Sequence, residues 1–343
     1  MTYFFIKESE MSVNPITVSV IVPAYNAAAT IGKTLEALSK QNCFQPFEVI
    51  VVDDGSSDNT ADIVSSFALV RYVRQDNAGP ASARNHGAQL AQGEYLAFTD
   101  SDCIPHENWI AELMQGFGKK EVGVVAGSYG IANPESLLAR CIYKEILWRH
   151  MNLMPEYPNA FGSYNFCVKK EVFNAVGGFN TAYRNASGED NDLSYKAIGA
   201  GWRIYFQPKA LVDHYHPTRV VKYLKEQFRH GFWRVKMYQD HPRMMRGDGY
   251  TFWKDIIEVP WVGLLLGGLL LSAWHGVTFS HVLLFILFPF LIFEVLYALI
   301  MTRCLFEGIF YGFIFLFRAL SRTFGFSTGI LLFLILKIAK IFQ

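Results

Sequence analysis

Three stretches in the first third of the chain decide the fold: TVSVIV at 17–22, VIVVDDGSSD at 49–58 and YLAFTDSD at 95–102. Each begins as a short apolar run rich in β-branched or aromatic residues, which favours a strand buried on both faces. The second and third runs end directly in acidic residues. Buried strands that stop at carboxylates are typical of a sheet whose edge carries a polar site.

The segments between these strands have helical spacing. We predict helices over 30–40, 60–67 and 82–90, and a further strand over 70–73. Strands that alternate with helices indicate a mostly parallel α/β sheet. Ligands of such sheets bind at the carboxyl ends of the strands, which is where the acidic clusters lie.

Composition separates this domain from the rest of the chain. Of the 343 residues only 18% are charged, against about a quarter in ordinary soluble domains. The shortage is local, because 259–302 contains a single charge, Glu294. Roughly 255 residues remain for one large soluble domain. The net charge of +1 argues against a nucleic-acid partner held by bulk charge.

Several familiar signatures are missing from the sequence. The first strand runs into Pro23-Ala24-Tyr25-Asn26 and not into GxGxxG, and Gly32-Lys33-Thr34 lacks the first glycine of a phosphate loop. The five cysteines form no CxxC pair, which predicts neither zinc nor a disulfide framework. Residues 1–16 have no basic start and no continuous apolar core, so we interpret them as an N-terminal extension and not as a signal peptide.

Acidic groups follow apolar runs at three places: Asp53-Asp54, Asp100-Ser101-Asp102 and Glu189-Asp190. A D-x-D after a buried strand brings two carboxylates to one sheet edge, where they can hold a hard divalent cation that neutralises a diphosphate. A single acidic turn is equally compatible with a helix cap. Three of them in this order favour a catalytic site.

The motifs VSVIVPAYN (18–26), VVDDGSSDNT (51–60), GPASARNHGAQLAQGEYLAFTDSD (79–102), GGFN (177–180) and GEDNDLSYKAIGAGWRIYFQP (188–208) together resemble inverting glycosyltransferase family 2. The resemblance covers roughly Val18 to His216. It implies a GT-A fold, which is a Rossmann-like mixed sheet, a nucleoside-diphosphate sugar donor, and Mg²⁺ or Mn²⁺ as cofactor.

The resemblance also implies roles for residues that bind the donor. Pro23, Tyr25 and Asp54 match positions that surround the base, with Asp54 accepting a hydrogen bond from a uracil-like ring NH. Arg84 matches a position near the base and diphosphate, and its planar guanidinium suits a phosphate. Asp100 is expected at the ribose or at a metal-bound water.

Metal binding and catalysis are assigned in the same way. Asp102 matches a direct metal ligand, and His214 in VDHYHP matches a histidine that completes the metal shell, with His216 as the near alternative. Asp190 matches the catalytic base, and Glu189 is its neighbour or a contact to the acceptor. The implied reaction is a single displacement that inverts the anomeric carbon.

A basic segment, 219–258, follows the expected catalytic domain at 17–218. Between Arg219 and Lys254 it has nine Lys or Arg against three acids, and its apolar residues recur at helical spacing. A basic amphipathic helix of this kind is typical of an anionic membrane surface. A helix packed on the catalytic domain with a solvated basic edge remains the alternative.

The last segment, 259–343, is expected to be a membrane region. The 44 residues of 259–302 suffice for two spans, about 259–276 and 281–302, and 323–341 is left open as a third span or a re-entrant piece. Arg303 and the basic segment put both ends of the hairpin inside. We therefore expect a multi-pass protein of the inner or plasma membrane with a cytoplasmic catalytic domain.

These observations predict a metal-dependent transfer of one sugar, from a UDP-linked donor, to a lipid-linked acceptor in cell-surface glycan or exopolysaccharide synthesis. The partners are then the donor, the lipid-linked acceptor and membrane lipid. A polyprenyl-phosphate sugar synthase and a short processive synthase are the enzymatic alternatives. A non-catalytic sugar-nucleotide sensor is the alternative of another class, although a sensor needs no base such as Asp190. A nucleotidyltransferase suits the GED element poorly.

Overall fold

The computed structural model describes residues 16–184, 187–246, 253–275, 281 and 283–341. Its catalytic half is built on one eight-stranded sheet in the order β3-β2-β1-β4-β7-β6-β8-β5. The strands are β1 Val18–Ala24, β2 Phe47–Asp53, β3 Val70–Arg74, β4 Tyr95–Thr99, β5 Cys103–Pro105, β6 Val122–Ile131, β7 Asn165–Lys169 and β8 Arg203–His214. The four strands predicted from apolar runs are confirmed as β1 to β4.

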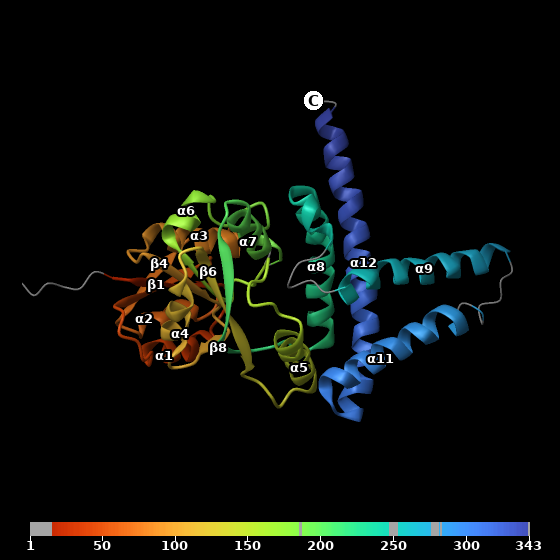
Figure 1. Cartoon of the computed structure of the whole chain (residues 1–343), viewed down its shortest axis with the longest axis horizontal. Coiled ribbons are helices and arrows are strands. Elements are labelled where there is room, and N and C mark those ends of the chain that lie inside the picture. The colour runs from red at the N-terminus through yellow and green to blue at the C-terminus, as the bar shows by residue number, and fades with distance from the viewer. Residues whose placement is uncertain (1–15, 185–186, 247–252, 276–280, 282, 342–343) are drawn as a thin grey trace, which may run out of the picture.

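Seven helices accompany the sheet within the described part of the catalytic half (Figure 1). They are α1 Ile31–Ser39, α2 Thr60–Ser65, α3 Pro80–Leu90, α4 Trp109–Gln115, α5 Leu137–Asn152, α6 Lys170–Ala175 and α7 Glu189–Gly199. The three helices predicted from the sequence are confirmed as α1, α2 and α3. Helix α3 begins with proline at its first turn, where no intrahelical N–H donor is needed.

The sheet is mixed, and this sets the position of the site. Strands β3, β2, β1 and β4 are parallel, as predicted, but β7 joins β4 antiparallel and β5 joins β8 antiparallel. The pairing of β5 with β8 places Cys103 opposite His214. The end of the TDSD turn therefore meets the VDHYHP segment, although the two lie far apart in sequence.

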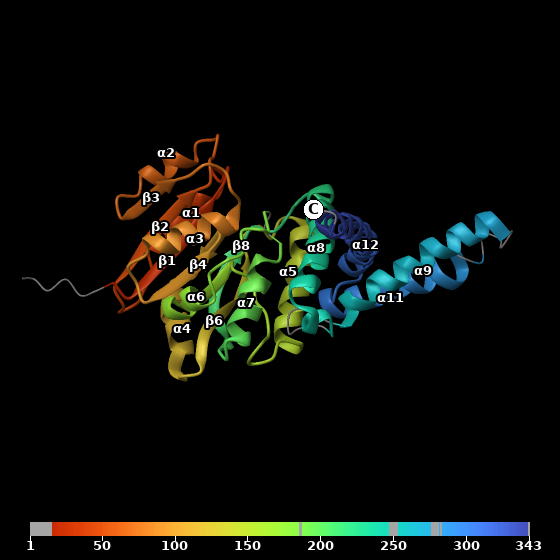
Figure 2. The ribbon, with the colours of Figure 1, turned by 90° about the horizontal axis from the view of Figure 1, so that it is seen from above.

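A second group of helices lies on one side of the catalytic half (Figures 1 and 2). It comprises α8 Val220–Asp240, α9 Trp253–His275, the π-helical turn η3 Leu283–Leu287, α11 Phe288–Thr302 and α12 Leu305–Ile341. Helices α9 and α11 project away from the catalytic half side by side. Helix α12 runs across this pair and lies along α8.

Three described stretches are long and apolar enough to cross a membrane: Lys254–Ser272, Leu284–Thr302 and Leu305–Phe333. The first two correspond to the expected hairpin, although α9 already begins at Trp253. The third differs from the expectation, because α12 runs unbroken from Leu305 and not from residue 323. The charges that interrupt the apolar pattern, Arg318 and Arg322, are inside this helix and are paired with acids of other helices.

Small residues let α8 and α12 approach closely. A Cβ on Gly325 would lie 2.0 Å from the carbonyl oxygen of Phe228, and a Cβ on Gly231 would lie 2.1 Å from that of Arg322. Further along, the rings of Phe232 and Phe333 are 5.4 Å apart. The apolar face of α8 that was expected on the membrane surface is thus covered largely by α12, because the glycines create a contact that no periodicity reveals.

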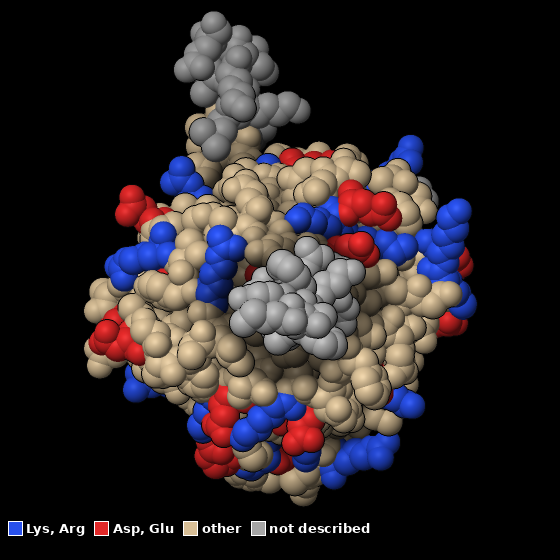
Figure 3. Space-filling view, turned by 90° about the vertical axis from the view of Figure 1, so that its left-hand side faces the viewer, with Lys and Arg blue, Asp and Glu red and all other residues tan. Residues whose placement is uncertain are grey.

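The opposite end of the molecule has an ordinary solvated surface. Figure 3 shows the face of the catalytic half that points away from α9 and α11, with Lys and Arg interspersed among Asp and Glu. Mixed charges of this kind are typical of a soluble surface. The catalytic half therefore has a surface suited to water, whereas α9 and α11 at the other end of the molecule have apolar surfaces.

Candidate active site

The turn after β2 is held by its two aspartates. Asp53 accepts hydrogen bonds from the Ser56 N–H at 2.7 Å and from the Tyr72 hydroxyl at 2.7 Å, so it orients the turn. Asp54 accepts from the backbone N–H groups of Ala78 and Gly79 at 2.9 and 2.8 Å. The Asp54 carboxylate, predicted to receive a base N–H, is thus already fixed against the loop that precedes α3, and it is only 4% exposed.

The other predicted base contacts lie at the end of β1. Pro23 is the sixth residue of the strand and is buried. Tyr25 follows the strand and is 55% exposed. Asn26, next in the chain, has a positive φ of 49° and accepts from the Ser57 N–H at 2.9 Å, which ties this turn to the one after β2. An exposed ring between two tied turns is suited to stack on a base.

Arg84 links the D-x-D turn to the GED element. One terminal nitrogen donates to Asp100 at 2.7 Å and the other to Glu189 at 3.0 Å, and the arginine side chain is 3% exposed. Burial alone would lower the pKa of Arg84, but the Asp100 and Glu189 carboxylates outweigh it, so the pKa is raised and the charge is kept. These two ion pairs use two of the five N–H donors of the guanidinium, and Arg84 Nε has no hydrogen-bond partner among the described residues.

The GED element begins helix α7. Gly188 precedes it with a φ of 99°, a conformation that favours glycine, and Glu189 and Asp190 form the first turn. Burial and the neighbouring Asp190 raise the pKa of Glu189 to about 7, against the opposing effect of Arg84. Burial also raises the pKa of Asp190. A half-buried carboxylate with a raised pKa is suited to accept a proton.

The structure gives Glu189 buried contacts. Expected as a neighbour of Asp190 or as a contact to the acceptor, Glu189 precedes Asp190 in the first turn of α7, is 2% exposed, pairs with Arg84 and accepts from the Ser187 N–H at 2.8 Å. Its carboxylate therefore positions Arg84 and the start of α7. This leaves Asp190, which is half-buried, as the more open carboxylate of the pair.

Asp102 and His214 are brought together by the β5–β8 pairing. The Asp102 carboxylate is 3.5 Å from His214 Nε2, and these two side chains and Cys103 form one candidate metal-ligating group among the described residues. Burial lowers the pKa of His214, but Asp102 outweighs it and the net shift is upward. Burial and the adjacent Asp102 raise the pKa of the Cys103 thiol well above its usual range. Carboxylate oxygen and imidazole nitrogen suit Mn²⁺, whereas a protonated thiol does not.

His216 is behind His214 and not beside Asp102. The two Nδ1 atoms are 3.1 Å apart, so one ring donates to the other. Burial and the neighbouring His214 lower the pKa of His216 to about 3, which keeps it neutral. Of the two histidines left open by the sequence, His214 is the one whose Nε2 faces the carboxylate.

An aromatic stack near these residues was not anticipated. The rings of Tyr129 and Tyr164 lie 3.7 Å apart and nearly parallel, and His150 stacks on Tyr129 at 6.2 Å. A Cβ on Gly162 would lie 3.5 Å from Asp190 Oδ2, so this corner adjoins the candidate base. The sequence carries no signal for the stack, because β6, β7 and α5 bring its members together from separate segments.

A polar contact ties α7 to the end of α8. Asp192 accepts from Lys196 at 2.6 Å and meets His241 Nε2 at 2.8 Å. Nearby, the Tyr183 hydroxyl donates to Asp240 at 2.9 Å. The helix that carries Asp190 is therefore fixed to the helix that lies along α12.

The comparisons with known proteins agree with this geometry. The family model described as Glycosyl transferase family 2 matches residues 19–187. The chain is 31% identical over 228 residues to Glycosyltransferase AglE of Haloferax volcanii, which covers 64% of this chain and 74% of that protein. It is 34% identical over 177 residues to Glycosyltransferase GlyG of Streptococcus pneumoniae, covering 46% of this chain but only 58% of that relative.

A solved structure shows the same fold over nearly the whole chain. It is the mannosyltransferase PcManGT from Pyrobaculum calidifontis, with a TM-score of 0.59, 21% identity, and coverage of 91% of this chain and 88% of that one. The sheet and the relatives together define the class as a GT-A glycosyltransferase. The chain belongs to glycosyltransferase family 2.

Proposed function

We propose that this enzyme transfers one sugar from a nucleoside-diphosphate sugar to a hydroxyl of a lipid-linked acceptor, with inversion at the anomeric carbon. The observation that supports the proposal is the pairing of Arg84 with both Asp100 and Glu189, which fixes the D-x-D turn against helix α7, whose first turn carries Asp190. Donor-side and base-side carboxylates are thereby held in one rigid site.

The proposed chemistry divides among these residues. Tyr25 and the turn at Asp54 bind the base, and a uracil nucleotide is our first choice because Asp54 is an acceptor. Asp190 takes the proton of the acceptor hydroxyl as the oxygen attacks the anomeric carbon from the side opposite the diphosphate. A positioned base of this kind contributes roughly 10²–10⁴-fold in rate.

A divalent cation, Mg²⁺ or Mn²⁺, fits the Asp102–His214 pair. The two ligand atoms are 3.5 Å apart, and the Asp102 side chain is 42% exposed. When bound, the cation supplies charge that stabilises the departing diphosphate. The structural neighbour PcManGT was solved with GDP-Man and Mn²⁺, which supports the presence of a cation but makes a guanine donor the alternative to UDP.

The membrane arrangement follows from the helix directions. Helices α9 and α11 form a hairpin, whereas α12 runs across it (Figures 1 and 2). Spanning helices tilt by about 20° on average from the bilayer normal, so a helix that runs across the hairpin is better suited to lie along the membrane interface. From Phe306 to Phe324 the exposed large apolar residues of α12 recur at helical spacing: Phe306, Ile309, Phe313, Phe317 and Phe324. Further along, Ile330, Leu331, Leu332 and Ile335 are all exposed.

We therefore infer two spans, with α12 lying in the interface beside α8. The domain division is proposed accordingly as a catalytic domain at 17–218, an interfacial segment at 219–258 and a membrane region at 259–343. Two spans return the chain to the side from which it started, which keeps Arg303 with the catalytic domain in the cytoplasm. The variants Phe313→Cys and Phe317→Cys test this topology. Each new cysteine should react with a lipid-soluble reagent but not with a reagent that is confined to the far side of the membrane.

The function is tested by donor turnover in detergent or lipid nanodiscs. A panel of UDP- and GDP-linked sugars is supplied with Mn²⁺, with and without a polyprenyl-linked sugar acceptor. Release of one nucleoside diphosphate per acceptor, and only with acceptor, is expected. Many sugars added per acceptor would indicate a processive synthase, and a product on polyprenyl phosphate itself would indicate a polyprenyl-phosphate sugar synthase.

Tight donor binding without turnover on any acceptor would contradict the proposal. That result would favour a sugar-nucleotide sensor recruited to the membrane. A matched measurement of product stereochemistry by NMR tests inversion, since a retained anomeric configuration would exclude the single displacement at Asp190.

A further inference from the structure

A cavity of about 630 Å³ lies between the catalytic half and the helices of the membrane region. Its wall is built by β6 and β8 on one side and by α5, α8, α9 and α12 on the other. This volume is within the range of small-molecule and cofactor sites. The family match, which ends at residue 187, includes the lining residues from Tyr129 to Met154 but none of those from His214 onward.

The inner end of the cavity reaches the reaction centre. Tyr129 and His214 line it, and His214 Nε2 is 3.5 Å from Asp102. Tyr129 stacks on Tyr164, beside the Gly162 corner where a Cβ would lie 3.5 Å from Asp190. A hydroxyl group held at this end would therefore lie next to His214, a candidate metal ligand, and on the Tyr129 side of the stack whose other ring, Tyr164, lies two residues from Gly162 in sequence.

The outer end is apolar and is made by helices suited to lipid. Ile256, Val259 and Pro260 of α9 and Phe326 of α12 line it. The three α9 residues lie within the candidate span Lys254–Ser272, and Phe326 lies within Leu305–Phe333. A water-soluble acceptor would gain little from contact with these apolar side chains. A bound hydrocarbon chain, in contrast, would cover them and exclude water, which is favourable.

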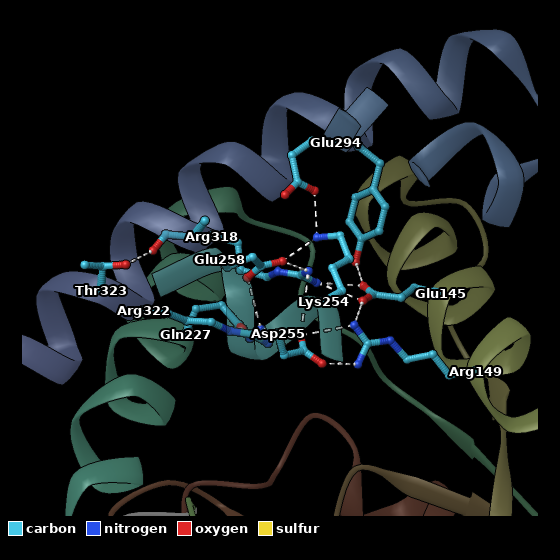
Figure 4. A network of polar contacts seen from close by, with 12 residues as sticks. Glu145, Arg149, Gln227, Lys254, Asp255, Glu258, Glu294, Arg318, Arg322 and Thr323 are labelled. Carbon is cyan, nitrogen blue, oxygen red and sulfur yellow. Dashed lines mark hydrogen bonds and ion pairs between the residues drawn. The ribbon is translucent and has the colours of Figure 1, made fainter. Parts of the chain in front are cut away.

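The wall of the cavity carries four arginines, Arg149, Arg234, Arg318 and Arg322, and three acids, Glu145, Glu226 and Asp255. Arg149 of α5 and Arg322 of α12 both contact Asp255 of α9, at 2.8 and 2.7 Å, and Figure 4 shows this junction. All three line the cavity. The shared carboxylate fixes the spacing of the three helices, so the shape of the cavity is set by the same contacts that dock the catalytic domain.

We propose that this cavity is the acceptor site, and that it takes a hydroxyl-bearing polar head joined to a long hydrocarbon chain. The head lies at Tyr129 and His214, and the chain leaves past Val259 and Phe326 toward the bilayer. This inference rests on the proposed function and adds where the acceptor binds and which part of it each element recognises. Two sources share this chemistry, a sugar on a polyprenyl diphosphate and a sugar on a diacylglycerol.

Two matched tryptophan variants of α9 test the proposal. Val259→Trp fills the outer end, whereas Leu264→Trp changes a residue of the same helix that is 66% exposed and outside the cavity. For Val259→Trp we expect the KM of the long-chain acceptor to rise about tenfold or more, with unchanged KM for the donor. A short-chain, water-soluble version of the same acceptor should show no difference between Val259→Trp and wild type.

Leu264→Trp should behave as wild type with both acceptors. Equal use of the long-chain acceptor by wild type and Val259→Trp would overturn the assignment of the cavity. An equal loss with long-chain and short-chain acceptors would also overturn it, because the effect would not depend on the chain. Absence of transfer by the wild-type enzyme to either acceptor would contradict the proposed function itself. A difference between wild type and Val259→Trp is therefore interpreted only where the wild-type enzyme is active.

Photo-crosslinking on the wild-type enzyme gives a second readout that needs neither turnover nor a variant. Two probes carry a diazirine on the hydrocarbon chain, one a polyprenyl-diphosphate sugar and the other a diacylglycerol glycolipid. Labelled peptides containing Ile256 or Phe326, with competition by the unlabelled lipid, are expected for the probe that is the true acceptor class. Labels confined to the outer surface of α9, at Leu264 or Leu270, with both probes would overturn the proposal.

Discussion

The molecule contains two clusters of charged side chains that differ in balance. In the catalytic half, Asp100 and Glu189 share Arg84, and Asp102 and Asp190 add further acid without another arginine. At the junction with the apolar C-terminal helices, this group of charges holds four acids and four bases (Figure 4): Glu145, Asp255, Glu258 and Glu294 against Arg149, Lys254, Arg318 and Arg322.

The difference indicates two tasks. Charges in an apolar region are tolerated when they are paired with one another, and the junction satisfies this condition with its own side chains. The catalytic cluster keeps an excess of negative charge. This excess favours binding of a cation, either alone or together with a substrate that carries the cation. The junction therefore joins two parts of the chain, while the catalytic cluster is suited to bind something that the chain does not supply.

Removal of the divalent cation is expected to have the largest effect. A chelator should lower turnover by about 10³-fold or more, since a bound metal contributes several kcal/mol to stabilising the transition state. Restoration by added Mn²⁺ or Mg²⁺ is the control, measured as acceptor-dependent release of nucleoside diphosphate. Full activity after exhaustive chelation would show that the acidic residues of the catalytic cluster do not bind a cation required for turnover.

Asp190→Asn is expected to have the next largest effect on catalysis. Turnover should fall roughly 10²–10⁴-fold because the amide cannot take the acceptor proton, while donor affinity and Tm stay near wild type. Asp62→Asn, an exposed carboxylate of α2, is the matched control and should leave turnover unchanged. Turnover at the wild-type rate in Asp190→Asn would remove Asp190 as the base.

The junction is tested by stability and not by rate. Glu258→Gln leaves Lys254 and Arg318 without a full counter-charge in a buried site, which should cost roughly 3–5 kcal/mol of stability and lower Tm in nanodiscs. The matched control is Glu36→Gln, since Glu36 and Lys40 also form an i,i+4 pair but are each 60% exposed. Equal Tm values for both variants would show that the junction does not hold the two parts together.

The pH dependence of stability gives the smallest of the four effects. The pKa of Glu189 is raised from 4.5 to about 7, mainly by burial, so the folded protein favours the protonated form. Its contribution to stability is present below pH 4.5 and is lost as the pH rises toward 7, by on the order of 1–3 kcal/mol. Tm of the metal-free protein between pH 5 and 8, compared with Glu189→Gln, measures this. A Tm difference between wild type and Glu189→Gln that does not change with pH would contradict a raised pKa for a buried Glu189.

The central sheet could be predicted because its strands are continuous β-branched runs that stop at polar clusters. The order of Asp53, Asp102 and Asp190 along the chain, together with the family motifs, also allowed the candidate site to be assembled. The choice between His214 and His216 could not be made, because it depends on the antiparallel register of β5 with β8. The buried position of Glu189 likewise depends on Arg84, a residue distant in sequence.

The membrane region was harder to predict for the same physical reason. Arg318 and Arg322 look like the end of an apolar segment, since an unpaired charge in lipid is costly. Their partners Glu145, Asp255 and Glu258 come from helices elsewhere in the chain, so the pairing that keeps α12 continuous is invisible locally. The cavity bounded by these residues was unpredictable on the same grounds.

Binding of Mn²⁺, measured by electron paramagnetic resonance on the purified enzyme in nanodiscs with a nucleoside diphosphate, tests the difference between the two clusters most directly. We predict one bound ion per chain in wild type and in Glu258→Gln, and none at the same concentration in Asp102→Asn. An ion that survives in Asp102→Asn but is lost in Glu258→Gln would contradict the account, because the cation would then belong to the junction.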